Sequence, residues 1–260
     1  MFFSKKKVVN VVYLSGIISS SGRKPLSLAN SKPLLDKAFK PKDTKAVCLI
    51  INSPGGSAAQ SEIIANYIKE QMQETKIPVI AFVEDVAASG GYFIASVATE
   101  IYALAKSSII GSIGVLYSGF GFNNLIKKHG IERRIYSAGE NKVILDSFQE
   151  EKAEDIAIIN ELLQETHEHF KNFVKAGRGN KLQANDKELF SGKFWLAGTG
   201  VKLGLIDGII TSYQSFFKER FGKKVKINVI KTKKSFLSNL LNTKIDLNET
   251  LIEDIVAQIK

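Results

Sequence analysis

The sequence predicts an α/β fold made of strand–turn–helix units, and two segments carry that prediction. Residues 46–51 (AVCLII) and 78–83 (PVIAFV) are apolar runs, which is typical of strands buried on both faces of a parallel sheet. Each run is followed by a glycine-rich turn and then by a segment that can form a helix. A repeated strand, turn and helix indicates helices layered on a sheet.

The other elements follow from local patterns. Residues 8–18 are expected to form a first strand, and residues 19–34 a loop rich in Ser, Gly, Lys and Pro. Ser57 and Gln60 have the spacing of a capping box and predict the start of a helix that runs to about Thr75. Further strands are predicted at 109–116, 131–136 and 205–207, and further helices at 92–98, 122–128, 152–176, 194–203 and 248–260.

Length and composition fit either one large domain or a domain with an appendage. The chain has 260 residues, 44% of them hydrophobic, and we expect a core at residues 1–211 and a basic α/β extension at residues 212–260. A single cysteine excludes an internal disulfide, and Cys48 lies in an apolar run, so we expect a buried, inert thiol. No stretch approaches the roughly 18–20 apolar residues that span a bilayer.

Charge is concentrated in one segment of a basic chain. The net charge is +10, and residues 218–234 carry eight Lys or Arg against one acid, Glu219. Such a segment fits either a solvated face or contact with an anionic membrane surface. Because no nucleic-acid motif accompanies it, we expect no nucleic-acid partner. We expect a cytoplasmic protein, peripheral at the inner membrane, and an anchor upstream of Met1 is compatible with the sequence.

Ser89 and Lys142 are the residues on which a chemical function can be built. Ser89 follows the second buried strand and precedes a predicted helix, and Lys142 stands 53 residues later (142 − 89). A serine is a poor nucleophile until a base removes its proton, and no histidine lies close to either segment in the sequence. A lysine can be that base where a dry pocket lowers its pKa from about 10.4 toward about 7–8. The alternative is a helix-capping serine and a solvated surface lysine.

The two glycine-rich turns supply groups that could stabilise an oxyanion. Gly55 follows the strand at 46–51, and Gly90 follows the proposed nucleophile. The ends of neighbouring parallel strands meet at one edge of a sheet, where open sheets bind ligands. Two backbone N–H groups at that edge could bind the negative oxygen of a tetrahedral intermediate.

Several other sites are excluded by spacing. The turn SPGGS lacks the Gly-Lys-Ser/Thr ending of a phosphate-binding loop, and Ala87 occupies the first glycine position of a Gly-x-Ser-x-Gly elbow. His129 stands at a helix end, where the helix dipole favours a basic group. His167 and His169 are two residues apart on a predicted helix and should point to different faces, so we expect no metal site.

Three motifs together resemble one family. Residues 50–56 (IINSPGG), 85–92 (DVAASGGY) and 111–115 (GSIGV) resemble the signal peptide peptidase A (protease IV) family, and its short SohB-like members most, over residues 8–230. The resemblance implies a Clp-protease/crotonase-like α/β superhelix assembled into homo-oligomeric rings, and it places a Ser–Lys peptidase core at residues 1–211. It assigns a catalytic dyad to Ser89 and Lys142, the latter in a Gly-x-x-Lys segment, and oxyanion donors to Gly55 and Gly90. Ser112 matches a serine that hydrogen-bonds the lysine.

The resemblance leads to one functional hypothesis and two rivals. The first is a serine endopeptidase that cleaves unstructured or membrane-derived peptides, such as signal peptide remnants, without a cofactor. Within residues 1–260 we expect none of the membrane anchors that are common in the family, and Glu140 and Asn141 make the lysine segment less basic than usual. A non-catalytic ring scaffold at a membrane is the second hypothesis, and an acyl-CoA enzyme of the crotonase type is the third. The polar segment around Lys142 has little apolar material to bury it, so we expect a site shared between subunits.

Overall fold

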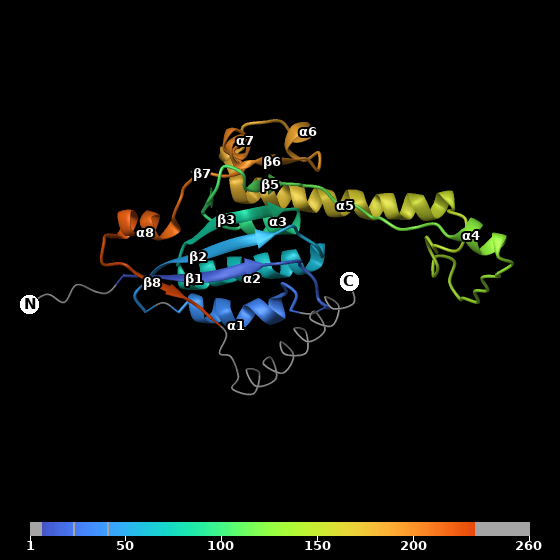
Figure 1. Cartoon of the computed structure of the whole chain (residues 1–260), viewed down its shortest axis with the longest axis horizontal. Coiled ribbons are helices and arrows are strands. Elements are labelled where there is room, and N and C mark those ends of the chain that lie inside the picture. Colours follow the sequence, from blue (N-terminus) through green and yellow to red (C-terminus); the bar gives the residue numbers. More distant parts are fainter. Residues whose placement is uncertain (1–6, 23, 41, 232–260) are drawn as a thin grey trace, which may run out of the picture.

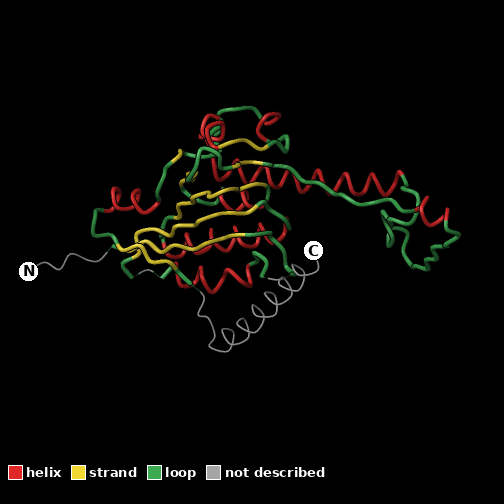
Figure 2. Tube along the Cα trace, in the orientation of Figure 1, coloured by secondary structure: helices red, strands yellow, loops and turns green. Residues whose placement is uncertain are grey.

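A single mixed sheet with helices on both faces forms the body of the protein. The computed structural model describes residues 7–22, 24–40 and 42–231 (Figure 1, Figure 2). The strands are β1 (Val8–Ser15), β2 (Thr44–Ser53), β3 (Val79–Ala88), β4 (Glu100–Ala103), β5 (Ile109–Gly111), β6 (Phe194–Leu196), β7 (Gly208–Ile209) and β8 (Lys226–Val229). Their order is β6-β5-β3-β2-β1-β8, with β4 beside β3 and β7 beside β4, and every pair is parallel except β5–β6.

The helices cover the sheet unequally. They are α1 (Leu28–Ala38), α2 (Ala58–Thr75), α3 (Gly90–Ala95), α4 (Asn123–Lys128), α5 (Ala153–Arg178), α6 (Asp186–Leu189), α7 (Ala197–Lys202) and α8 (Tyr213–Phe221), with a 3₁₀ turn at Gly179–Lys181. One face of the sheet packs on α1, α2, α3 and the end of α5 in the larger apolar core. The other face packs on α8, where Phe82 contacts Tyr213 and Phe217.

Alternation along the buried strands explains the two cores. Val47, Leu49 and Ile51 of β2 join the larger core, whereas Cys48 and Ile50 join the smaller one. Successive side chains of a strand point to opposite faces, so a continuous apolar run fits a strand covered on both sides. The prediction of a buried cysteine is confirmed, and burial raises the pKa of its thiol well above the ordinary value.

A long arm projects from this body. The segment at residues 115–152, which contains α4, and the first half of α5 extend away from the sheet (Figure 1). Only Asp155, Phe170, Val174 and Arg178 of the 26 residues of α5 are buried, and the last three lie in its final third. The predicted strand at 131–136 is wrong, because those residues form no strand. Ile131 and Tyr136 of the arm are instead exposed.

Several other predicted elements are confirmed with shifted bounds. The loop predicted at 19–34 is wrong from Leu28 onward, where α1 begins after its N-cap residue Ser27. Ser57 caps α2 by accepting a hydrogen bond from the Gln60 N–H over 3.3 Å, whereas the Gln60 side chain accepts from the Leu28 N–H rather than closing the box. The strand predicted at 109–116 ends at Gly111. Residues 194–203 form β6 and then α7, and the strand predicted at 205–207 comes later, as β7.

The basic extension contributes to the same sheet in the residues that are described. Its strand β8 pairs with β1 in parallel, and the Ile230 N–H continues this pairing to the Val11 carbonyl over 2.8 Å. Because α8 also packs on the sheet, residues 213–229 lie on the body of the protein. The boundary at residue 211 stays a prediction. The predicted helix at 248–260 lies outside the described residues.

Candidate active site

Ser89 occupies a sharp turn between β3 and α3. Its backbone has φ 51° and ψ −123°, a left-handed conformation that L residues rarely adopt. The turn is held from both sides, because the Ser89 N–H donates to the Gly111 carbonyl over 2.8 Å and the Ser89 carbonyl accepts from the Phe93 N–H over 2.9 Å. Strained residues of this kind persist where the surroundings over-determine them, which is frequent at functional sites.

Gly55 lies directly against this turn. A Cβ built at Gly55 would stand 2.7 Å from the Ser89 Cβ and 2.8 Å from the Gly90 nitrogen, and φ at Gly55 is +102°. Glycine is therefore required there both for conformation and for space. The Gly90 N–H borders the open space that this missing side chain leaves. The Gly55 N–H itself donates to Ser53 Oγ over 3.2 Å.

Helix α3 begins at the turn and packs by backbone contact. A Cβ at Gly90 would lie 2.2 Å from Ser61 Oγ, and one at Gly91 would lie 2.4 Å from the Ser53 carbonyl oxygen. These two glycines let α3 approach the end of β2 and the start of α2. The two glycine-rich turns predicted from the sequence therefore meet at one edge of the sheet.

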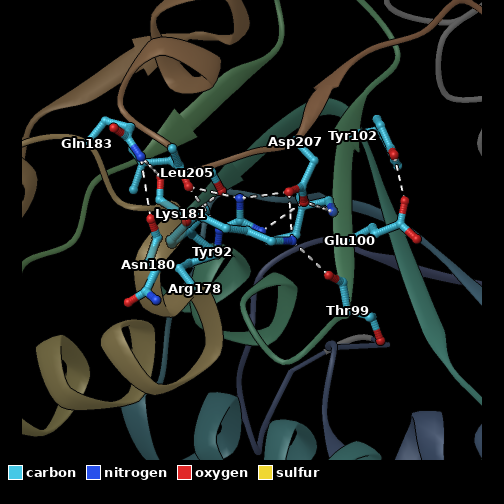
Figure 3. A network of polar contacts seen from close by, with 12 residues as sticks. Tyr92, Thr99, Glu100, Tyr102, Arg178, Asn180, Lys181, Gln183, Leu205 and Asp207 are labelled. Atoms are coloured by element: carbon cyan, nitrogen blue, oxygen red, sulfur yellow. Dashed lines mark hydrogen bonds and ion pairs between the residues drawn. The ribbon is translucent and has the colours of Figure 1, made fainter.

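A buried polar network holds the other side of α3 (Figure 3). Tyr92 is fully buried, and its hydroxyl donates to the Leu205 carbonyl over 2.7 Å. Arg178, at the end of α5, donates two hydrogen bonds to the neighbouring Gly204 carbonyl and pairs with Asp207 over 2.8 Å. Asp207 also accepts from the Ile101 N–H over 2.7 Å. The loop that anchors Tyr92 is thus tied to both α5 and β4.

A cleft of about 1090 Å³ opens beside Ser89. Its walls come from the start of α2, from α3, from the residues after β5, from the middle of α5 and from the loop before β6. Phe93 and Phe170, whose ring centroids are 5.1 Å apart, contribute apolar surface to it. Such a cavity, lined by both apolar and polar side chains and next to a strained serine, has the character of a substrate site.

Ser112 also lines the cleft. It has a left-handed backbone with φ 51°, and its N–H donates to the Lys193 carbonyl over 2.7 Å. The structure therefore brings Ser112, Ser89 and Gly90 to one cleft.

Lys142 is not among the residues of this cleft. It belongs to the arm between α4 and α5, where it is exposed and its N–H closes a turn to the Gly139 carbonyl over 3.2 Å. Nearby, the Asp155 carboxylate accepts from the Leu145 N–H over 3.1 Å, and Lys127 pairs with Glu150 over 2.7 Å. These contacts order the arm within the chain and leave the Lys142 side chain outside the Ser89 cleft of the same chain.

The sequence analysis missed one pair of residues at the cleft. Glu62 of α2 and His169 of α5 both line it and contact each other, with 3.2 Å between Glu62 Oε1 and His169 Nε2. His167 lines the cleft as well, and its Nε2 lies 3.2 Å from the Ile113 carbonyl oxygen. The two histidines serve different contacts, as their spacing implied. Nothing local in the sequence marks Glu62, because its neighbours on α5 are more than a hundred residues away.

The described part of the chain holds neither a cluster of metal ligands nor a helix that could span a membrane. Among residues 7–22, 24–40 and 42–231, no group of three or more His, Cys, Asp or Glu side chains could hold a metal ion. In the same part of the chain, no helix is long and apolar enough to cross a membrane.

The fold and the cleft together define a class, an α/β protein of the Clp-protease type with a serine presented on a strained strand-to-helix turn. A model of the family "Peptidase family S49" matches residues 71–226, more than half of the chain. The chain belongs to peptidase family S49. This confirms the resemblance to signal peptide peptidase A and SohB proteins.

Named relatives agree with this membership. The chain is 31% identical over 212 residues to a putative signal peptide peptidase SppA of Enterococcus faecium, covering 79% of this chain and 60% of that protein. It is also 31% identical over 234 residues to a probable protease SohB of Haemophilus influenzae, covering 90% of this chain and 64% of that protein.

Higher identity is found with part of a much longer protein. The chain is 48% identical over 236 residues to a protein of Brucella abortus named Na(+)/H(+) antiporter NhaA, of which it covers 32%. The chain therefore spans about a third of that relative and about 60% of the Enterococcus protein.

Solved structures show the same fold. One is a lysine-to-alanine mutant of the 1510-N membrane-bound stomatin-specific protease in complex with a substrate peptide. It aligns with a TM-score of 0.52 at 20% identity, covering 93% of this chain and 99% of that chain. The likeness confirms the predicted Clp-protease-like fold.

Proposed function

We propose that the protein is a serine endopeptidase in which Ser89 is the nucleophile and Lys142 the general base. The observation that carries the proposal is the position of Ser89, on a strained turn against Gly55 at the edge of a 1090 Å³ cleft. A buried serine with a structural role needs neither the strain nor the open space beside it. Membership of peptidase family S49 supports the same reaction class.

In this mechanism Ser89 Oγ attacks the carbonyl carbon of the peptide bond. The neutral amine of Lys142 takes the hydroxyl proton and later gives a proton to the leaving amine. Water then attacks the acyl-enzyme ester and releases the second product. Ser112 would orient the lysine amine from the cleft wall.

The oxyanion would be bound by backbone N–H groups of the two glycine turns. Gly90 supplies the first, beside the space that Gly55 leaves open. The Gly55 N–H is the second donor in the proposal, and to serve it must exchange its 3.2 Å hydrogen bond with Ser53 Oγ for one with the oxyanion.

We further propose that Lys142 reaches the Ser89 of a neighbouring subunit in a homo-oligomeric ring. Two observations support this: Lys142 lies on an arm outside the cleft of its own chain, and the arm exposes large apolar side chains. Phe120 is 79% exposed and Tyr136 is 94% exposed. Apolar surface of this kind is frequent at contacts between proteins. A head-to-tail contact of arm on body would close into a ring.

The substrates of the proposal are unstructured or membrane-derived peptides, and the expected location is cytoplasmic, peripheral at the inner membrane. A peptide that is already extended can enter the cleft without unfolding. The basic residues of α8 and β8 would provide the membrane contact.

Complementation between two inactive variants tests the dyad and its sharing. Ser89→Ala and Lys142→Ala should each abolish cleavage of a fluorogenic peptide. When the two chains are unfolded together and refolded into mixed rings, roughly a quarter of shared sites should recover both groups. Full activity in Lys142→Ala would refute the base. No recovery in rings confirmed to be mixed would place the dyad within one chain, and labelling of Ser89 by a fluorophosphonate would report the nucleophile independently.

A further inference from the structure

The cleft beside Ser89 is acidic on a strongly basic protein. The chain carries 36 Lys and Arg against 26 Asp and Glu, yet none of the cleft residues in the described part of the chain is a lysine or an arginine. Two glutamates, Glu62 and Glu165, line it instead. Among the residues of one chain, a substrate side chain that enters the cleft therefore meets two carboxylates, and the Lys142 amine that the proposed mechanism brings from a neighbouring subunit is neutral when it acts as the base.

Glu62 lines the same cleft as Ser89. It follows Ser61, which packs against Gly90 so tightly that a Cβ on Gly90 would lie 2.2 Å from Ser61 Oγ. Glu165 is exposed on α5, whereas the Glu62 side chain is 39% exposed and lies in the wall between α2 and α5. Partial burial reduces solvent screening, so the Glu62 carboxylate interacts more strongly with a cation in the cleft.

Within the described part of the chain, the Glu62 carboxylate has only weak interaction partners. His169 Nε2 lies 3.2 Å away and carries a positive charge only when protonated, and its side chain is 50% exposed. The Asn66 amide is at the limit of hydrogen bonding, 3.5 Å away. A lysine or arginine of the substrate would give Glu62 a permanent charge partner and a shorter, charge-assisted hydrogen bond.

Apolar surface near Glu62 suits the stem of such a side chain. The Phe93 ring lines the cleft and stands 6.0 Å, between centroids, from the His169 ring that faces Glu62. Lysine and arginine lay their methylene stems on apolar surface while the charged end reaches a polar partner. Phe93 and Glu62 both line the cleft, so apolar surface and a carboxylate are available in one site.

We propose that Glu62 is a specificity-determining residue that selects peptides with a lysine or arginine next to the bond that Ser89 cleaves. This rests on the proposed peptidase function of Ser89 and names the substrate class of that site. If only the aromatic rings of Phe93 and Phe170 contacted the substrate side chain, the cleft would prefer apolar residues. A preference for apolar side chains is therefore the competing outcome.

Peptide pairs that differ only in lysine against methionine, placed in turn at each position flanking the cleaved bond, test the proposal. Binding is measured by fluorescence anisotropy on Ser89→Ala protein, and kcat/KM is measured on protein with Ser89 intact. At one position the lysine peptide should bind about tenfold or more tightly than the methionine peptide. Glu62→Gln should remove the preference for lysine mainly by raising KM for the lysine peptide. It should leave kcat/KM for the methionine peptide within about twofold of its original value. Glu62→Lys should transfer the preference to a glutamate peptide.

Glu70→Gln is the matched control, because Glu70 is a glutamate of the same helix outside the cleft. Glu70→Gln should change neither the binding nor the kcat/KM of the lysine and methionine peptides. An equal loss for both peptides in Glu62→Gln, or tighter binding of methionine at every position by the protein with Glu62 intact, overturns the proposal. Since binding is read without catalysis, lysine-selective binding without any cleavage would overturn the peptidase function and keep the role of Glu62.

Discussion

Replacing Asp207 with asparagine should destabilise the protein far more than the loss of an ordinary ion pair. Arg178 pairs with Asp207 over 2.8 Å, and the Arg178 side chain is only 1% exposed. Removing one partner of a buried pair leaves an uncompensated charge and costs about 3–5 kcal/mol. Asp207 is 17% exposed and asparagine keeps one acceptor oxygen, so we expect the lower end, about 3 kcal/mol.

The same pair gives the effect a pH dependence with a defined sign. Burial by itself raises the pKa of Asp207, but hydrogen bonds from Arg178, Lys181 and the Ile101 N–H outweigh it and hold the pKa below the ordinary value. A carboxyl whose folded pKa is depressed stabilises fully above its unfolded pKa, about 3.9, and loses that contribution as the pH falls through the folded pKa. The difference in free energy of unfolding between the native protein and Asp207→Asn should have its full value at pH 7 and become smaller below about pH 4.

Guanidinium chloride unfolding followed by circular dichroism measures this difference in free energy. Asp186→Asn is the control, because Asp186 pairs with Lys175 of α5 at the surface, with side chains 55% and 43% exposed. Its loss should cost about 1 kcal/mol or less. Equal destabilisation by the two substitutions, or a difference for Asp207→Asn that persists unchanged from pH 7 to pH 3, would refute the reasoning.

Two further predictions concern the oxyanion turn and the basic extension. Gly55→Ala should lower kcat by about 100-fold or more, because the added methyl would lie 2.8 Å from the Gly90 nitrogen. Gly22→Ala is the control and should keep activity, because Gly22 also has a positive φ but a methyl there would meet nothing within 4 Å. A near-normal kcat in Gly55→Ala would contradict the assigned oxyanion donors. The protein should sediment together with acidic vesicles at low salt and be released at high salt. Each Lys or Arg that contacts the membrane should contribute about 1 kcal/mol to the binding free energy. Lys223→Glu combined with Lys224→Glu should weaken that binding. If the protein does not bind acidic vesicles at low salt, the basic segment is a solvated surface rather than a membrane contact.

Local patterns were sufficient for the elements whose partners are near in sequence. The runs at 46–51 and 78–83 became the centres of β2 and β3, because apolar residues on both faces can be buried only between two layers. Ser57 caps α2 as its spacing predicted. The turns at Gly55 and Gly90 were also predictable, since glycine tolerates the backbone geometry and the close approach that those turns need.

The failed strand at 131–136 has a physical reason that the sequence does not contain. A strand needs a partner for its backbone groups, and the arm provides no sheet edge at that place (Figure 2). Ile131 and Tyr136 have the residue types of a strand, but β propensity expresses fit to a pleated, half-buried surface. Where that surface is missing, the same residues remain in loops.

The sequence by itself determined the two central strands β2 and β3, the two glycine turns and the serine after the second strand, because spacing along the chain controls hydrogen bonding and backbone conformation within each unit. Only the tertiary structure decided which distant side chains join them. Glu62 contacts His169 in the wall of the cleft, and Arg178 holds the loop that anchors Tyr92. The position of Lys142 on the arm is also a tertiary result. These contacts depend on how the layers pack, and packing distances are not encoded in any local pattern of residues.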